Sequence, residues 1–189
     1  MPLAYKIKRT MREQGISDEI ISQFHFPSPK ETTMDDMISI VNQMDMLLSK
    51  EQCLSIMERQ GCQKTGKMAV TARAFGQEHA GKSLEEKITL YNESDVAYKV
   101  PTKLNPDGTL SVYWKVGEEG QYKCACSDVK KQKKQPADIS LTYCGCCGGH
   151  LRETYRLALG VNLRIKEVVS SPINSAGKKH CEFLFEIID

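Results

Sequence analysis

The chain lacks the features that would place it in a membrane or on a nucleic acid. Its apolar runs are only a few residues long, as in Met46–Leu48, whereas a helix that crosses a bilayer needs ~20 apolar residues. Its 26 Lys and Arg residues nearly balance 24 Asp and Glu residues, for a net charge of +2, so nothing indicates a polyanionic partner. The basic N-terminal residues are not followed by an apolar stretch, and this excludes a signal peptide. We therefore expect a cytoplasmic protein with no membrane and no nucleic acid partner.

The length and composition are those of a globular domain. The chain has 189 residues, of which 40% are hydrophobic and 26% are charged, which excludes a disordered or collagenous chain. Since a typical domain has ~100–150 residues, we predict a single domain over 1–189, with a helical part at 1–95 and a sheet-and-helix part at 96–189.

Apolar residues recur every three or four positions through the first third of the chain, which is typical of amphipathic helices. The clearest case predicts a helix over 34–48. Ser49-Lys-Glu-Gln52 and Ser83-Leu-Glu-Glu86 both have the pattern of a capping box, in which the first and fourth residues cap each other, so each predicts a helix start.

Apolar and polar residues alternate in the second half of the chain, as they do in strands with one buried face. The predicted elements are a hairpin with strands at 96–100 and 110–116 around Asn105–Gly108, a third strand at 122–126, a helix at 148–159 ending at Gly160, and strands at 161–165 and 181–187. This order predicts an α+β fold, an antiparallel sheet with the N-terminal helices packed on it.

The main chemical signal is the distribution of the eight cysteines, five of which lie between positions 124 and 147. In a reducing compartment, clustered thiols bind metal or react more often than they form disulfides. The segment Cys144-Gly-Cys146-Cys147-Gly-Gly-His150 offers several thiolates within one turn, and thiolates are typical zinc ligands. Cys124 and Cys126 could add a ligand.

Two other interpretations of these cysteines stay open. Cysteine also packs as a small buried hydrophobe, and this is the interpretation that the apolar patterns around Cys53, Cys62 and Cys124 favour. Alternatively, Cys146 and Cys147 would lie at the N-terminus of the 148–159 helix, where the helix dipole lowers a thiol pKa. His150 could then serve as a base for Cys147 in a thiol-dependent hydrolase or redox enzyme.

Several motifs in the C-terminal third carry a family resemblance. They are Tyr143-Cys-Gly-Cys-Cys-Gly-Gly-His150, a helix ending at Leu159-Gly160, Glu167-Val-Val-Ser170, and Gly177-Lys-Lys-His-Cys181-Glu-Phe183. Over about residues 143–187 the chain resembles the four-vinyl-reductase domain, a small-molecule-binding module of the NO-signalling and Golgi-transport ligand-binding fold class. The resemblance implies a sheet-and-helix wall around a cavity and a homodimer.

The resemblance also implies a zinc site. In aromatic-sensing members of the family, a Glu, a Cys three residues later and the Cys of a last-strand Cys-x-Phe bind zinc beside an apolar effector pocket. Glu167 and Cys181 match the first and last of these ligands, while Ser170 stands where the middle Cys is expected. The glycine-flanked cysteines would complete the set, which gives zinc ligands at Cys144, Cys146, Cys147, Glu167 and Cys181.

Three functions follow as expectations. The first is a sensor-like small-molecule-binding protein with a zinc site and a small apolar ligand. The second is the thiol enzyme that uses Cys147 and His150. The third is an interaction subunit, which would need an exposed apolar face.

Overall fold

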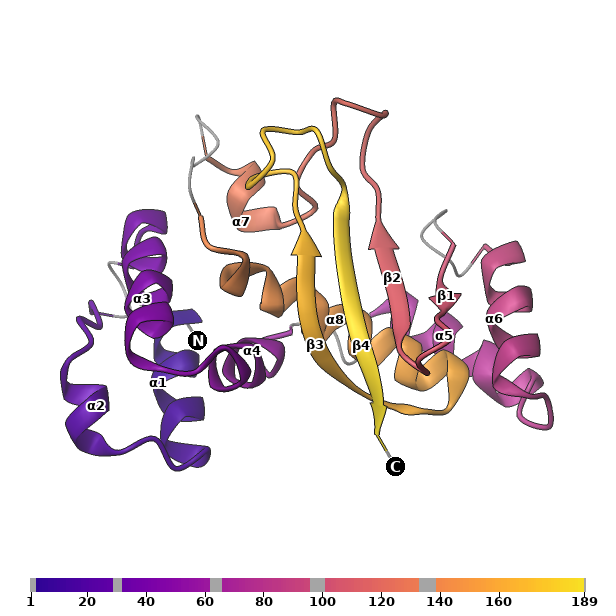
Figure 1. The fold of residues 1–189 in the computed structure, drawn as a ribbon, viewed down its shortest axis with the longest axis horizontal. Helices are drawn as coiled ribbons and strands as arrows, with labels where there is room; N and C mark the ends of the chain where they lie inside the picture. Colours follow the sequence, from indigo (N-terminus) through magenta and orange to yellow (C-terminus); the bar gives the residue numbers. More distant parts are fainter. Residues whose placement is uncertain (1–2, 29–31, 62–65, 96–100, 133–138, 189) are drawn as a thin grey trace.

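The sheet and the helices around it are shown in Figure 1. The computed structural model describes residues 3–28, 32–61, 66–95, 101–132 and 139–188. The helices before the sheet are α1 (Leu3–Glu13), α2 (Asp18–Ser22), α3 (Met34–Leu47), α4 (Lys50–Glu58), α5 (Lys67–Glu78) and α6 (Leu84–Glu93). The remaining elements are β1 (Lys103–Leu104), β2 (Leu110–Trp114), α7 (Ser127–Lys130), the 3-10 helix η1 (Leu141–Cys144), α8 (Gly145–Leu159), β3 (Asn162–Ser170) and β4 (Cys181–Ile188). The α+β class is therefore confirmed.

Both predicted capping boxes are present. The Ser49 hydroxyl accepts from the Gln52 amide at the start of α4, and the Gln52 side chain accepts from the Ser49 amide. The same reciprocal pair joins Ser83 and Glu86 at the start of α6. These bonds satisfy amides that an α-helix leaves without partners in its first turn.

The four strands are antiparallel and lie in the order β1-β2-β4-β3. The predicted hairpin around Asn105–Gly108 is confirmed, and Gly108 supplies the positive φ of its turn. The strand before the turn is Lys103–Leu104, since the predicted strand at 96–100 lies outside the described residues.

The third predicted strand, at 122–126, was wrong. The Tyr122 amide donates to the Gly177 carbonyl at 2.9 Å and the Lys123 amide donates to the Val116 carbonyl at 2.8 Å. Val116 and Gly177 both lie in loops, so these hydrogen bonds do not add a strand to the sheet. The segment instead leads into α7. The alternation at 122–126 reflects burial against other side chains, which a strand pattern also produces.

One face of the sheet is covered by α8. Leu151 and Tyr155 of this helix share an apolar cluster with Phe183 and Phe185 of β4, and residues of α5 and α6 belong to the same cluster. A second cluster joins α1, α2 and α3 to α7 and η1. Figure 1 shows α1–α3 beside the sheet and not on it. The expectation that the N-terminal helices pack on the sheet was therefore wrong for these three, because α8 occupies that place.

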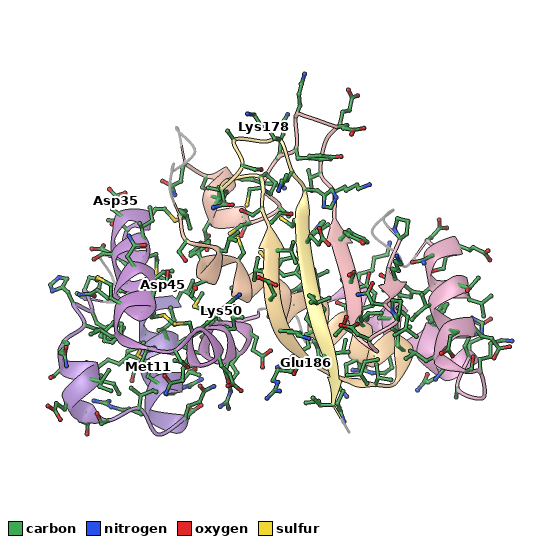
Figure 2. All side chains as sticks on the ribbon, in the orientation of Figure 1. Met11, Asp35, Asp45, Lys50, Lys178 and Glu186 are labelled. Atoms are coloured by element: carbon green, nitrogen blue, oxygen red, sulfur yellow. The ribbon has the colours of Figure 1, made fainter. Side chains whose placement is uncertain are left out.

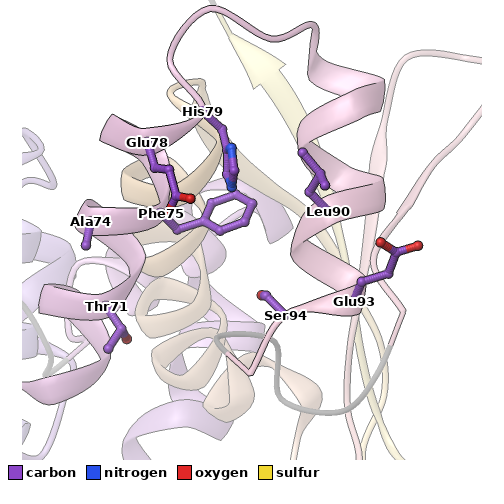
Figure 3. Close-up of a pocket in the computed structure, with 8 residues that line it drawn as sticks. All are labelled: Thr71, Ala74, Phe75, Glu78, His79, Leu90, Glu93 and Ser94. Carbon is purple, nitrogen blue, oxygen red and sulfur yellow. The ribbon is translucent and has the colours of Figure 1, made fainter.

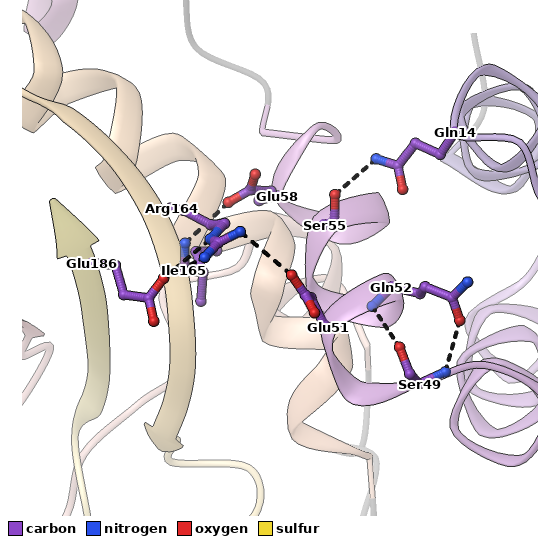
Figure 4. A network of polar contacts seen from close by, with 9 residues as sticks. All are labelled: Gln14, Ser49, Glu51, Gln52, Ser55, Glu58, Arg164, Ile165 and Glu186. Carbon is purple, nitrogen blue, oxygen red and sulfur yellow. Dashed lines mark hydrogen bonds and ion pairs between the residues drawn. The ribbon is translucent and has the colours of Figure 1, made fainter. Parts of the chain in front are cut away.

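Helix α4 belongs to both clusters and runs along the edge of β3. Its Leu54 lies in the first cluster and its Met57 in the second. The Glu58 carboxylate accepts from the Ile165 amide of β3 at 3.1 Å, and Arg164 reaches Glu51 at 3.4 Å and Glu186 at 2.6 Å (Figure 4). An edge strand that would otherwise expose its amides is thereby partly covered by side chains of α4.

Candidate thiol site

The glycines of the Cys-rich motif allow α8 to approach its neighbours closely. A Cβ on Gly149 would lie 1.8 Å from the Glu58 carbonyl oxygen of α4, and one on Gly148 would lie 2.6 Å from Cδ1 of Ile165 in β3. A Cβ on Gly145 would lie 2.8 Å from the Cβ of Met57. These glycines are therefore explained by helix packing, and the helix that contains them begins at residue 145, three residues before its predicted start.

Six cysteines from distant segments gather at one end of α8. Cys124 and Cys126 precede α7, Cys144 ends η1, Cys146 and Cys147 lie in the first turn of α8, and Cys181 begins β4. Their charges act on one another: the pKa of Cys181 is raised first by burial and then by the nearby Cys144 and Cys124. Thiols from segments far apart in the chain thus lie near enough to affect one another's pKa.

Cys126 is the thiol with the most hydrogen-bond donors around it. Its sulfur accepts from the Cys147 thiol, from the backbone amides of Val129 and Asp128, and from the Tyr143 hydroxyl, whose oxygen lies 3.7 Å away. The Cys147 bond contributes most, and together these donors lower the pKa of Cys126 to about 6 although burial opposes the change. Cys126 is therefore mainly a thiolate at neutral pH.

Cys147 differs from its partner in charge state. Its bond to Cys126 raises its pKa well above the ordinary thiol value, and burial and the neighbouring Cys146 add to the increase. Burial likewise raises the pKa of Cys144 to about 12, with the Ser171 hydroxyl bonded to its sulfur. The surroundings thus favour the thiolate form of Cys126 and the protonated form of Cys147.

The Cys147–His150 arrangement stays a prediction, but the electrostatics do not favour it. His150 is buried and its ring stacks on Trp114 with the centroids 5.7 Å apart. Burial lowers the pKa of His150, while that of Cys147 is raised. Sequence reasoning assigned the thiolate to Cys147 because of the helix dipole, whereas the contacts favour Cys126, which the sequence marked only as a possible extra ligand.

The predicted zinc ligands are brought together only in part. Cys144, Cys146, Cys147 and Cys181 belong to the thiol cluster, whereas the Glu167 carboxylate pairs with Lys50 Nζ at 3.0 Å. Ser170 donates its hydroxyl to the His180 carbonyl at 2.7 Å. Over the ranges that the structure describes, no three His, Cys, Asp or Glu side chains are arranged to hold a metal ion. Cys62 lies outside those ranges.

One hollow on the surface lies away from these thiols. It measures about 470 Å³ and lies between α5 and α6, with the Phe75 and His79 rings on one side and Leu90 on the other (Figure 3). Its lining contains no cysteine. A hollow of about 360 Å³ includes Lys178 and one of about 300 Å³ includes Glu186; Figure 2 shows these residues at opposite ends of the sheet. No cysteine lines any of these three hollows.

A fourth hollow, of about 260 Å³, does adjoin the thiol site. Tyr143 and Asp128 line it, and both also contact the Cys126 sulfur, the first through its hydroxyl and the second through its backbone amide. The apolar ligand cavity predicted beside the cysteines therefore has one candidate location.

Within the described residues, no helix is both long enough and apolar enough to cross a bilayer. Comparison of the chain with models of known families, with curated proteins and with solved structures gives no match. The resemblance to the four-vinyl-reductase domain therefore stays a prediction.

Proposed function

We propose that the protein performs thiol–disulfide chemistry with Cys126 as the attacking thiolate and Cys147 as the second thiol. The observation that carries the proposal is the set of groups around the Cys126 sulfur: the Tyr143 hydroxyl oxygen at 3.7 Å, the Cys147 thiol, and the backbone amides of Val129 and Asp128. Both residues are half-buried, so small reagents can reach them. The seven described cysteines are free thiols, which fits work in a reducing compartment such as the cytoplasm.

The donors around Cys126 match the needs of this chemistry. A thiolate is the nucleophile in disulfide exchange, and hydrogen bonds to a charged sulfur stabilise it relative to the thiol. Tyr143 is suited to remain a neutral donor, because burial and the Cys126 charge both raise the pKa of its hydroxyl. The order of reaction follows from the charge states, with Cys126 first and Cys147 second.

The reaction balances as a two-electron exchange. The Cys126 thiolate attacks one sulfur of a substrate disulfide, a mixed disulfide forms, and the other substrate sulfur leaves as a thiolate. Cys147 then gives its proton to this leaving thiolate and attacks the Cys126 sulfur, which releases the second substrate sulfur. The two protein sulfurs are oxidised to a disulfide, and the substrate is reduced to one thiol and one thiolate, which takes its proton from water. Small thiols restore the protein by the reverse steps.

The test is to map where a small disulfide reacts. The reduced protein is treated with one equivalent of hydroxyethyl disulfide, free thiols are alkylated, and the digest is analysed by mass spectrometry. We expect a Cys126–Cys147 disulfide in the wild type, a trapped mixed disulfide on Cys126 in Cys147→Ser, and slow reaction of Cys126→Ser. Cys146→Ser, which changes the neighbouring half-buried cysteine, should behave as the wild type. A first adduct on another cysteine, unchanged in Cys126→Ser, would exclude the proposal.

A zinc-holding, ligand-binding module is the second candidate, and the gathering of six cysteines favours it. The donors as placed do not form a three-ligand group, and Glu167 is engaged with Lys50, so no chemical step is assigned to a metal. Elemental analysis of protein purified without chelator decides the matter. If the protein contains about one zinc per chain, and if alkylation of Cys126 releases that zinc, the metal proposal replaces the thiol proposal.

A further inference from the structure

The hollow next to the thiol pair has an apolar floor and a polar rim. It lies between α1, α3, α7 and η1, and its apolar lining comes from Leu3, Met34, Met37 and the Tyr143 ring. The lining is completed by Lys131 and Gln132, which follow α7, and by Thr32 and Thr33, which precede α3. We refer to this cavity as the Met34 hollow.

Two of its lining residues connect the hollow to the reacting sulfur. The buried Tyr143 contributes its ring to the hollow, while its hydroxyl oxygen lies 3.7 Å from the Cys126 sulfur. Asp128 contributes to the lining, and its backbone amide donates to the same sulfur. Of the four hollows described on the surface, this is the one whose lining includes groups bonded to Cys126. A molecule seated there is one tyrosine ring away from the thiolate.

The charges of the hollow are already compensated. Lys131 Nζ lies 3.2 Å from the Asp128 carboxylate. At the start of α3, the Asp36 carboxylate accepts from the Thr33 amide at 2.8 Å and from its hydroxyl at 2.7 Å, so a carboxylate already occupies that helix terminus. An anionic ligand would have to displace these pairs, whereas a neutral ligand would not.

The apolar lining suits a flat or branched apolar group. Methionine side chains adapt to varied shapes and make favourable contacts with aromatic rings, and Tyr143 offers an aromatic surface of its own. The volume of about 260 Å³ lies just below the ~300–1,000 Å³ usual for small-molecule sites. The size therefore selects a small group and excludes a large cofactor.

We propose that the Met34 hollow is the substrate site of the thiol pair and that it takes uncharged, low-molecular-weight disulfides with an aromatic or branched apolar group. The assignment rests on the thiol function proposed above. Tyr143 is a positioning residue in this arrangement: it lines the hollow that holds the apolar group, and its hydroxyl, 3.7 Å from the Cys126 sulfur, orients that sulfur.

The test compares two disulfides that differ in their apolar groups. Dipyridyl disulfide carries two flat rings, and hydroxyethyl disulfide carries none. Met34→Trp and the rim variant Gln132→Trp both fill the hollow, while Ala74→Trp fills the hollow between α5 and α6 and serves as the matched control. We expect each filling variant to slow the reaction of Cys126 with dipyridyl disulfide by about tenfold. This is the effect of losing the contacts of one aromatic ring with the hollow. The rates with hydroxyethyl disulfide and the rates of Ala74→Trp should change less than about twofold.

Tyr143→Phe provides a separate readout. It keeps the ring that lines the hollow and removes the hydroxyl next to Cys126, so it should slow both disulfides by the same factor and leave their ratio unchanged. A ratio that changes in Tyr143→Phe as much as in Met34→Trp would contradict the division between a binding hollow and a positioning hydroxyl.

Binding is also measured without reaction, so that failure of the thiol function can be told apart from failure of the hollow. Dipyridyl sulfide has the same rings but no disulfide bond. On adding it, we expect the methionine methyl NMR signals of Met34 and Met37 to shift. Those of Met11 and Met57, which belong to the same apolar cluster but do not line the hollow, should not shift. If these signals shift but Cys126 is unreactive, only the thiol function fails. If Cys126 reacts with both disulfides equally fast in every variant and the Met34 and Met37 signals stay in place, the hollow is not the substrate site.

Discussion

The contact between α8 and α4 predicts that Gly149→Ala destabilises the protein, although alanine is the better helix former. The added Cβ would lie 1.8 Å from the Glu58 carbonyl oxygen and 2.6 Å from its carbonyl carbon, and ordinary contacts begin at 3.4 Å. Both opposing atoms belong to backbone, so no side chain can rotate to make room. The two helices must separate by roughly 1.6 Å at this point, the difference between 3.4 and 1.8 Å.

The size of the effect follows from two opposing contributions. Alanine in place of glycine stabilises a helix interior by about 1 kcal/mol, and overpacking a tight contact costs about 1–3 kcal/mol. Separation of the helices also lengthens the Glu58–Arg152 pair, now 2.6 Å, and the bond from the Ile165 amide to Glu58, at about 1–3 kcal/mol. These contributions give a net loss of about 1–5 kcal/mol, against the ~5–15 kcal/mol typical for a domain.

The assay is denaturant unfolding followed by tryptophan fluorescence. Trp114 is the one tryptophan of the chain, and it stacks on His150 of α8, so its emission reports on this helix. Gly81→Ala is the matched control, because a Cβ there meets nothing within 4 Å and should change the free energy of unfolding by less than about 0.5 kcal/mol. If Gly149→Ala proved as stable as the wild type, α4 and α8 could not approach as closely as the glycine contacts require.

Three further results are expected. The rate of Cys126 alkylation should rise with pH through a midpoint near pH 6 and then level off, whereas an ordinary thiol continues to gain rate up to about pH 9; a midpoint above pH 8 would contradict the donor arrangement. Glu58→Ala should lower the free energy of unfolding by about 2–4 kcal/mol, because it leaves the Arg152 charge and the Ile165 amide without this partner. Glu58→Gln, which keeps an acceptor for that amide, should cost clearly less in the same denaturation experiment. Oxidation to the Cys126–Cys147 disulfide closes a loop of roughly 20 residues and should stabilise the protein by about 3 kcal/mol; a lower melting temperature for the oxidised form would show that the two sulfurs cannot bond without distorting the fold.

The sequence predicted local features well where short-range rules govern them. The capping boxes at Ser49 and Ser83 depend only on residues three positions apart, and both are present. The turn at Asn105–Gly108 depends on glycine tolerating a positive φ. The failed strand at 122–126 shows the limit of the same rules, since alternating burial there results from contacts with loops that lie far away in the sequence.

The candidate site was less predictable because its key contacts are tertiary. Spacing placed Cys147 at a helix start and suggested His150 as its base, which is a local argument. The donors that act on Cys126 come from α7, from Tyr143 and from the first turn of α8, and no sequence pattern links these segments. A matching motif likewise selected Glu167, whose carboxylate in fact pairs with Lys50 of α4.

The packing and the chemistry of the Cys-rich motif depend on each other. The first turn of α8, which contains Cys147, packs closely against both α4 and the sheet, and this packing requires glycine at 148 and 149. Larger residues at these positions would move the first turn of α8, and a shift of about 1 Å is enough to weaken a hydrogen bond between two side chains. A Gly149→Ala variant that still folds should therefore lose part of the Cys126–Cys147 contact, and the reactivity of Cys126 should fall along with the stability. The glycines of this segment allow the close helix packing, and that packing sets the distance between the sulfurs of Cys126 and Cys147.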